Sequence, residues 1–363
     1  MTSLYQTTVG RYPGQVPLLG PLAAYLPTPR DENGRFLTKT FETLVDNAVV
    51  AGVTSVGVLG STGGFAYLPR STRKRVVRAA VEAADGRVPV IAGVGSFTLA
   101  EVIANVAEAE EVGADALLLP PVSYQPLTND EVYALYRDVT SRASIGVWVY
   151  NNPATTHYRF GVDELAALGR MNGVHGFKDR AATASEARER RRRVQETLPP
   201  RTAKRLQHGF SGDGIGAQVL LDGAATWHSS IAGVIPAAPS AIARAVEAGN
   251  AAEARSVQRQ LTSIAVLGAQ YGGIRVSHAL GELTGFEMGV LPRPLHPLPN
   301  DARSILRMAL RSIDVPAPTA SAREELVALR AKRASSAEVD APKGDPAGAA
   351  ASRRARHQAA GEG

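Results

Sequence analysis

The chain has 363 residues, of which 44% are hydrophobic and 20% charged, and its formal net charge is +6. This composition is typical of a globular protein with a large buried core. The chain has no cysteine, which excludes disulfides, cysteine-ligated metal sites and thiol catalysis. No stretch approaches the roughly 20 apolar residues of a membrane span. Because Met1–Arg11 also lacks a signal-peptide core, we expect a cytoplasmic protein with no membrane partner.

Short apolar runs alternate with amphipathic helical patterns from residue 16 to about residue 235. The runs predicted to be strands are Leu18–Ala24, Ser55–Leu59, Val88–Gly93, Ala114–Pro120, Ile145–Tyr150, Gly173–Lys178, Arg205–Gly209 and Ala224–Ser229. The helical patterns lie near residues 38–51, 71–84, 98–112, 128–142, 162–169, 182–197, 212–222 and 236–248. This order predicts one (β/α)8 barrel, the α/β fold also called the TIM barrel. The alternative is an open doubly wound sheet, but its glycine-rich fingerprint does not follow the first run.

After residue 249 the pattern becomes purely helical, near residues 250–267, 273–284 and 301–313. We therefore expect a small C-terminal helical appendage on the barrel. The predicted organisation is an N-terminal segment 1–15, the barrel 16–249, a helical subdomain 250–316 and a tail 317–363. The tail has no aromatic residue and cannot bury enough apolar surface to order itself, so we expect disorder apart from a helix at 321–333.

Basic residues gather in two clusters, at residues 188–193 and 353–356. The first cluster alternates with Glu186, Glu189 and Glu196 in a helical pattern. A solvated helix face is therefore favoured over a nucleic-acid patch, and we expect no nucleic-acid partner.

The candidate site residues follow the strands, because a (β/α)8 barrel carries its chemistry at their carboxyl ends. Lys178 ends the sixth run, where burial would lower its pKa and make the amine a nucleophile for a Schiff base. The alternative is a side chain that reaches solvent. The loop Gly60–Gly64 combines hydroxyls with exposed N–H groups, which suits a carboxylate, although an ordinary turn has the same composition. Tyr150 ends the fifth run, where it either transfers protons or caps the core.

Five motifs together resemble the dihydrodipicolinate synthase / N-acetylneuraminate lyase family. They are Gly60–Gly64, Ala92–Ser96, Tyr150–Pro153, Gly176–Asp179 and Ser211–Gly214, and the stretch Leu26–Gly34 also resembles the first loop of that family. Their order and spacing match from about residue 16 to residue 313. The resemblance implies a class I aldolase in which Lys178 forms a Schiff base with pyruvate or another 2-keto acid. It also implies Tyr150 as the proton shuttle.

The resemblance assigns the other site residues as well. Ser61, Thr62 and the Gly63 amide would hold the carboxylate of the keto acid, and Asp213 and Ser230 would contact the hydroxyls of a sugar-acid substrate. His228 departs from the family, many members of which have an aliphatic residue there, and its imidazole would bind substrate or assist proton transfer. For His228 the alternative is a packed side chain bonded to a neighbouring loop. No metal and no organic cofactor are expected, because the lysine supplies the electrophile. A homotetramer or homodimer is the expected assembly.

Several positions depart from the pattern of the family members that make dihydrodipicolinate. Gly64 stands where these synthases have glutamate, and Ser123 stands where they have a second relay tyrosine, with Tyr124 one place later. Thr155 replaces the arginine that grips their aldehyde substrate. These departures favour an aldolase, dehydratase or hydratase-aldolase that acts on a hydroxylated or aromatic 2-keto acid. A dihydrodipicolinate synthase with a remodelled proton relay and a non-catalytic keto-acid-binding barrel are the alternatives.

Overall fold

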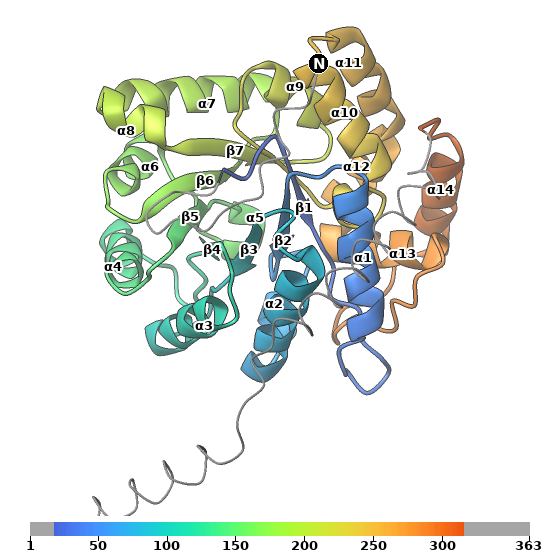
Figure 1. Cartoon of the computed structure of the whole chain (residues 1–363), viewed down its shortest axis with the longest axis horizontal. Coiled ribbons are helices and arrows are strands. Elements are labelled where there is room, and N and C mark those ends of the chain that lie inside the picture. Colours follow the sequence, from blue (N-terminus) through green and yellow to red (C-terminus); the bar gives the residue numbers. More distant parts are fainter. Residues whose placement is uncertain (1–17, 316–363) are drawn as a thin grey trace, which may run out of the picture. The chain divides into compact units, whose positions relative to one another are not determined.

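Eight parallel strands close into a barrel in the computed structural model, which describes residues 18–315. Each strand pairs with the next one in the chain, and β8 pairs with β1. Figure 1 labels the strands β1 to β7 inside the ring of helices. The strands are β1 (Leu22–Tyr25), β2 (Ser55–Val58), β3 (Val90–Gly93), β4 (Ala116–Leu119), β5 (Gly146–Tyr150), β6 (Val174–Arg180), β7 (Gln207–Ser211) and β8 (Trp227–Ser229). The predicted (β/α)8 barrel is therefore confirmed, and the open sheet is wrong because β1 and β8 are hydrogen-bonded neighbours.

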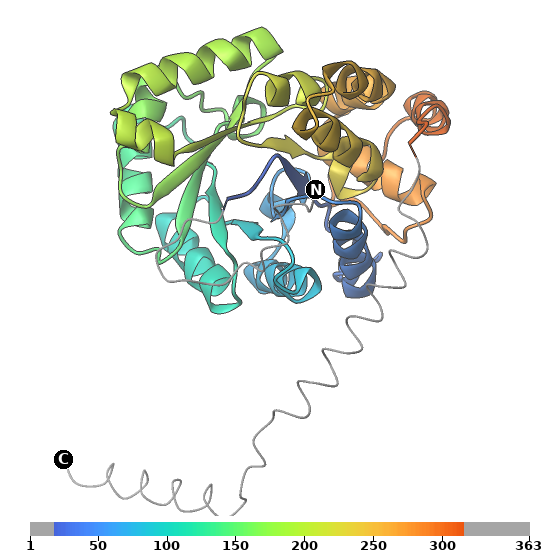
Figure 2. The same ribbon diagram turned by 45° about the horizontal axis from the view of Figure 1, so that its top comes forward.

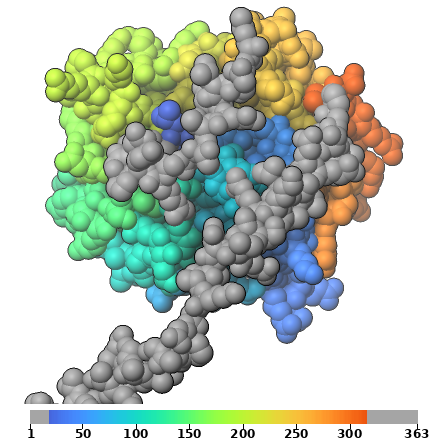
Figure 3. Space-filling model, viewed as in Figure 1, coloured from blue at the N-terminus to red at the C-terminus, as the bar shows by residue number. Residues whose placement is uncertain are grey.

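Helices surround the barrel in chain order, as the colours along the rim show (Figures 2 and 3). They are α1 (Thr38–Val50), α2 (Arg70–Ala84), α3 (Leu99–Glu111), α4 (Asn129–Thr140), α6 (Val162–Gly169), α7 (Ala184–Thr197), α9 (Gly216–Leu221) and α10 (Ala237–Glu247). Two short helices were not predicted, α5 (Pro153–Thr156) and α8 (Pro200–Arg205). Both begin with proline, which is favoured in the first helical turn because its missing N–H has no partner there in any case. Among residues 18–315, no helix is long and apolar enough to cross a membrane.

Four further helices form the predicted C-terminal appendage: α11 (Ala251–Gln260), α12 (Thr262–Tyr271), α13 (Gly273–Leu283) and α14 (Asn300–Arg311). The single helix predicted at 250–267 is in fact two helices that meet at Leu261, whose side chain is fully buried. The proline-rich stretch before α14 contains neither helix nor strand. The predictions for residues 1–15 and for the tail with its helix at 321–333 lie outside the described residues.

The barrel has one apolar core inside the strands and another between the strands and the helices. The inner core consists of Leu19, Ala23, Tyr25, Ile91, Ala116, Leu118, Trp148 and Tyr150. Successive side chains of a strand point to opposite faces. On β6, Gly176 and Lys178 therefore point into the barrel, while Phe177 and Asp179 point toward the helices.

The carboxylate of Asp179 connects β6 to three neighbouring elements. It is fully buried, accepts hydrogen bonds from Asn151 Nδ2 at 2.6 Å and Arg190 Nε at 3.0 Å, and lies 3.1 Å from His208 Nε2. Burial raises the pKa of this carboxyl, but His208 and Arg190 outweigh burial and lower the pKa below its ordinary value. The prediction that residues 188–193 form a solvated helix face is thus wrong for Arg190, which turns inward to balance a buried charge.

Replacing Arg190 with methionine is expected to lower the free energy of unfolding by about 3–5 kcal/mol, because the buried Asp179 carboxylate loses its cationic partner. Urea denaturation at pH 7 measures this loss. The lowered pKa of Asp179 contributes stability above the unfolded-state pKa of about 3.9, and that stability is lost as the pH falls through the folded-state pKa. The difference in free energy of unfolding between the wild type and Arg190→Met should therefore become smaller at acidic pH.

Arg192→Met is the matched control on the same helix. Arg192 is exposed and, among residues 18–315, pairs only with the exposed Glu189 and Glu196. We expect this variant to unfold at the wild-type urea concentration, so equal losses for the two variants would contradict the role of Arg190.

Candidate active site

The amine of Lys178 lies at the carboxyl end of the barrel between two tyrosine rings. Its Nζ is 3.2 Å from the centroid of the Tyr25 ring and 4.5 Å from that of Tyr150, and the residue is only 5% exposed. Burial lowers the pKa of the amine well below its ordinary value; Arg180 adds to this effect and Asp213 opposes it. The alternative of a lysine that reaches solvent is therefore wrong, and the amine has the environment of a nucleophile.

The phenol of Tyr150 joins Lys178 to the glycine-rich loop. The two residues are register partners on β5 and β6. Tyr150 Oη lies 3.0 Å from Ser61 Oγ, where either hydroxyl can donate, and it accepts a hydrogen bond from Asn152 Nδ2 at 3.1 Å. The structure thus brings three of the predicted residues together. It also adds Asn152, which the sequence analysis did not assign to the site.

The loop that contains Thr62 and Gly63 is held close to the end of β1. Thr28 Oγ1 donates a hydrogen bond of 2.9 Å to the Gly63 carbonyl. A Cβ on Gly63 would lie 3.0 Å from the Leu59 nitrogen and 3.2 Å from the Leu26 carbonyl oxygen, so this position has no room for a side chain. Thr62 is buried. Backbone packing, and not only the hydroxyls, therefore fixes the loop.

Asp213 and Ser230 meet where the chain leaves β7 and β8. Asp213 Oδ2 accepts hydrogen bonds from Ser230 Oγ at 2.5 Å and from the Ser230 and Ile231 amides at 3.2 Å each. Burial raises the pKa of Asp213, and these hydrogen bonds oppose the increase. Asp213 Oδ1 is buried and has no hydrogen-bond partner among the described residues. One carboxylate oxygen is therefore left to accept a hydrogen bond.

His228 lies inside the barrel and is not bonded to a neighbouring loop, since neither ring nitrogen has a hydrogen-bond partner within residues 18–315. Its ring meets the rings of Tyr25 and Trp148 edge-on, each at a centroid distance of 5.6 Å. Burial lowers the pKa of His228 well below its ordinary value, and the nearby charge of Lys178 adds to the effect. The imidazole is thus neutral and packed under the lysine.

Three glycines in the strands make room for the aromatic side chains around Lys178. A Cβ on any of them would lie less than 3.0 Å from the facing ring. The pairs are Gly57 with Tyr25, Gly176 with Trp148, and Gly209 with His228. Tyr25 was not among the site residues predicted from the sequence. The available signal was the glycine inside each strand, which often marks a close approach.

Replacing Tyr25 with leucine, with Gly57→Val to refill the space, is expected to lower the midpoint pH of adduct formation on Lys178 by about 1.5 units. The ring face at 3.2 Å stabilises a positive charge on Nζ, and such contacts contribute about 2 kcal/mol when desolvated. Borohydride trapping of a keto acid across a pH series gives the midpoint. Tyr25→Phe keeps the ring face and should keep the wild-type midpoint, so equal shifts in the two variants would rule out this effect of the ring.

Three residues discussed from the sequence do not join this group. Ser123 donates its hydroxyl hydrogen bond to the Gln125 carbonyl, and Tyr124 is 91% exposed. Thr155 is exposed and bonds to the Asn152 carbonyl. None of the three makes a hydrogen bond with Tyr150 in the part of the chain that the structure describes, where the hydrogen-bond partners of the Tyr150 phenol are Ser61 and Asn152.

The site can capture a molecule covalently and bind its oxygens. It offers one amine, one phenol, several hydroxyls and one carboxylate, all from the carboxyl ends of strands or the loops that follow them. Within residues 18–315, no three His, Asp or Glu side chains are grouped to hold a metal ion.

Comparison with known proteins gives a consistent family. The model of the dihydrodipicolinate synthetase family matches residues 19–313. An uncharacterized DapA-like lyase of Halobacterium salinarum is 31% identical over 278 residues, which is 75% of this chain and 88% of that protein. A 4-hydroxy-tetrahydrodipicolinate synthase of Methylococcus capsulatus is 31% identical over 296 residues, which is 80% of this chain and 97% of that enzyme.

Solved structures show the same barrel. A dihydrodipicolinate synthase from Agrobacterium tumefaciens has 34% identity and a TM-score of 0.77, with 82% of this chain and 98% of that chain covered. A prophage protein of the dihydrodipicolinic acid synthase family from E. coli K12, solved in complex with pyruvate, has a TM-score of 0.76 at 22% identity and covers 82% of this chain. At that identity the second likeness concerns the fold alone.

Proposed function

Because the chain belongs to the dihydrodipicolinate synthetase family and is a lyase of that family, we propose that it acts on pyruvate or another 2-keto acid through a Schiff base on Lys178. The observation that carries this proposal is the buried amine, whose pKa is lowered by burial. A neutral amine attacks the keto carbon to give a carbinolamine, which takes up one proton and loses water to give a protonated imine. The positive nitrogen then withdraws electrons, so a bond next to the imine carbon can break or form.

Tyr150 transfers the proton in this proposal. Its ring is 4.5 Å from the lysine nitrogen and its phenol is hydrogen-bonded to the Ser61 hydroxyl at 3.0 Å. A proton that leaves the substrate beside the imine therefore has a short path through two hydroxyls. Asn152 donates to the phenol oxygen, and this hydrogen bond would stabilise the phenolate that forms when Tyr150 gives up its proton.

Two groups of residues bind the substrate in this proposal. The Ser61 and Thr62 hydroxyls and the Gly63 amide hold the carboxylate of the keto acid, since the loop at Gly63 is fixed close to β1. Asp213, oriented by Ser230, accepts a hydrogen bond from a substrate hydroxyl through its unpartnered oxygen. These contacts favour a hydroxylated 2-keto acid and hence an aldolase, dehydratase or hydratase-aldolase reaction. In this proposal His228 does not react, and its neutral imidazole packs beneath Lys178 inside the barrel.

The second candidate is 4-hydroxy-tetrahydrodipicolinate synthase, the name of the relative from Methylococcus capsulatus at 31% identity. The local chemistry argues against it, because Thr155 supplies no guanidinium and Ser123 supplies no phenol. Turnover of pyruvate with aspartate semialdehyde, followed by the loss of pyruvate, separates the two candidates. Robust turnover would contradict the proposed hydroxylated substrate and identify the semialdehyde as the second substrate. The proposed Schiff base on Lys178 would not be affected by this result.

Borohydride trapping tests the Schiff base directly. The full chain is incubated with pyruvate, reduced and weighed by mass spectrometry, with an unreduced sample as the control. We expect one adduct per chain that maps to Lys178 and whose mass equals pyruvate minus one water plus two hydrogens. The absence of an adduct with pyruvate and with a panel of hydroxylated and aromatic 2-keto acids would overturn the proposal. An assembly of two or four copies is part of the same proposal, and light scattering measures it.

A further inference from the structure

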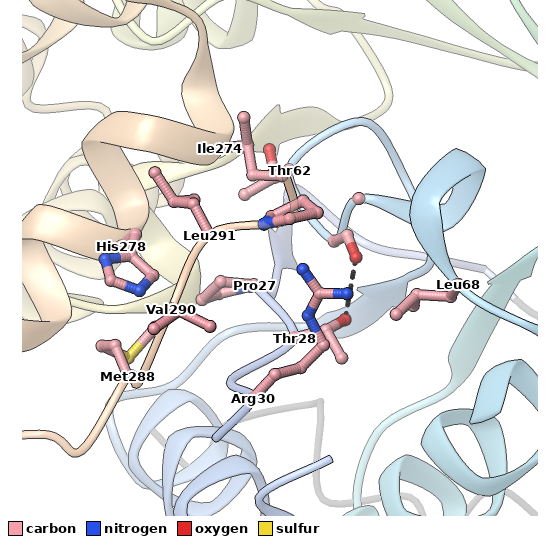
Figure 4. Close-up of a pocket in the computed structure, with 13 residues that line it drawn as sticks. Pro27, Thr28, Arg30, Thr62, Leu68, Ile274, His278, Met288, Val290 and Leu291 are labelled. Carbon is pink, nitrogen blue, oxygen red and sulfur yellow. Dashed lines mark hydrogen bonds between the residues drawn. The ribbon is translucent and has the colours of Figure 1, made fainter. Parts of the chain in front are cut away.

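A small cavity lies behind the glycine-rich loop, outside the group around Lys178. Figure 4 shows its walls, which come from the end of β1, from the loop at Thr62–Gly64, from α13 and from the chain at Met288–Pro292. Its volume is about 20 Å³. A cavity of about 10–15 Å³ already admits one water-sized particle, so this one has room for a single small ion or molecule.

Arg30 supplies the one fully charged side chain in the wall of this cavity. The residue is 8% exposed, and its guanidinium makes no hydrogen bond and no ion pair with any described residue. Its backbone is fixed, because its amide donates to the Met288 carbonyl and its carbonyl accepts from the Val290 amide. Burial lowers the pKa of the guanidinium, and no carboxylate opposes that effect. Its five donors have no acceptor among residues 18–315, and an anion in the cavity would supply one.

The other walls of the cavity also fit an anion. His278 on α13 lines the same cavity as Arg30. Burial lowers the pKa of its imidazole, and the charge of Arg30 adds to this effect. Glu282 is the nearby carboxylate, but it faces His278 Nδ1 at 3.4 Å and pairs with Arg303, and it does not line the cavity. The remaining side chains are mostly apolar, among them Leu68 and Ile274. No carboxylate in the lining competes for the positive charge.

We propose that this cavity binds one small monovalent anion of about the size of chloride, held by the guanidinium of Arg30. The charge follows from the single unpartnered cation in the wall, and the small size follows from the volume, which suits one particle about as large as a water molecule. The cavity shares Thr62 and Gly63 with the loop described above, so the bound anion stabilises the conformation of that loop. This site does not depend on the Schiff-base chemistry proposed for Lys178.

Bromide is the probe, because it resembles chloride and scatters anomalously. Crystals of the full chain grown in sodium bromide should give an anomalous peak beside the Arg30 guanidinium, and the peak should persist in Lys178→Ala. The peak should vanish in Arg30→Met, which keeps an unbranched stem. A map of wild-type crystals with no bromide at Arg30, or with an ordered water there instead, would overturn the proposal.

Thermal unfolding in solution gives a second, independent test. At matched ionic strength and at tenfold excess over its dissociation constant, chloride should raise the melting temperature by about 3 °C relative to gluconate, which is too large for the cavity. Arg30→Met should lose this difference. Arg35→Met removes an exposed arginine nearby. This variant should keep the difference in melting temperature between chloride and gluconate. If Arg30→Met does not fold, Arg30→Lys replaces it, with a weaker chloride effect expected. Equal chloride effects in wild type and the Arg30 variant would contradict the site.

Discussion

Lys178→Ala is expected to abolish the borohydride-trapped adduct and to lower kcat by at least about 10³-fold, because the group that forms the covalent intermediate is removed. Lys178→Met is the better-packed companion, since it keeps an unbranched stem between the Tyr25 and Tyr150 rings. Both variants should lose the adduct with every 2-keto acid that labels the wild type. The measurements are intact-mass spectrometry after reduction and steady-state turnover.

Stability measurements distinguish lost chemistry from lost folding in these variants. Replacing a buried amine with an apolar group is often neutral or stabilising, so Lys178→Met should unfold at or above the wild-type urea concentration. The pKa of Lys178 is lowered in the folded state, so the unfolded chain binds more protons at pH values between the folded-state pKa and about 10.4. The free energy of unfolding of the wild type therefore rises with pH in this window. Any excess stability of Lys178→Met over the wild type should become smaller as the pH rises.

A surface lysine supplies the matched control for this experiment. Lys39 is exposed at the start of α1, and Lys39→Ala should keep both the adduct and turnover. If the adduct persisted in Lys178→Ala, or if Lys39→Ala lost it, the Schiff base would lie elsewhere in the chain.

Tyr150→Phe is expected to lower kcat by about 10²–10⁴-fold, the usual contribution of a positioned acid or base. The adduct should still form on Lys178 at long incubation. The variant keeps the ring beside the lysine at 4.5 Å but loses the phenol that contacts Ser61 and Asn152. The measurements are turnover, the yield of trapped adduct and exchange of the keto-acid C3 protons with deuterium. Proton exchange should fall with turnover, because both need the phenol.

Ser61→Ala provides the comparison for Tyr150→Phe. It removes one hydrogen-bond partner of the phenol but leaves the phenol itself and Asn152 in place. We expect a smaller loss of proton exchange than in Tyr150→Phe. Wild-type exchange in Tyr150→Phe would exclude Tyr150 as the proton shuttle, whereas a missing adduct in a folded variant would assign it to imine formation instead.

The candidate site shows where reasoning from sequence stops. Lys178, Tyr150 and Ser61 were identified because each ends or follows a strand, and the carboxyl ends of strands gather at one mouth of a barrel. Tyr25 was missed because the predicted first strand ended at Ala24, and only the structure shows that Tyr25 ends β1 and packs over Gly57. Arg190 was misjudged because a run of arginines does not reveal which one turns toward a buried carboxylate such as Asp179.

Local patterns by themselves determined the alternation of strands and helices, the closed barrel expected from it, and the strand ends at which reactive groups stand. These features depend on periodicity and chain order, which a sequence states directly. Only the tertiary structure decided which side chains meet across the barrel, because such contacts join residues far apart in the chain. The Lys178 amine against the Tyr25 ring and the unpartnered Arg30 guanidinium at its cavity are both of this kind. Their burial, and hence their pKa, is set by packing from several strands and helices at once.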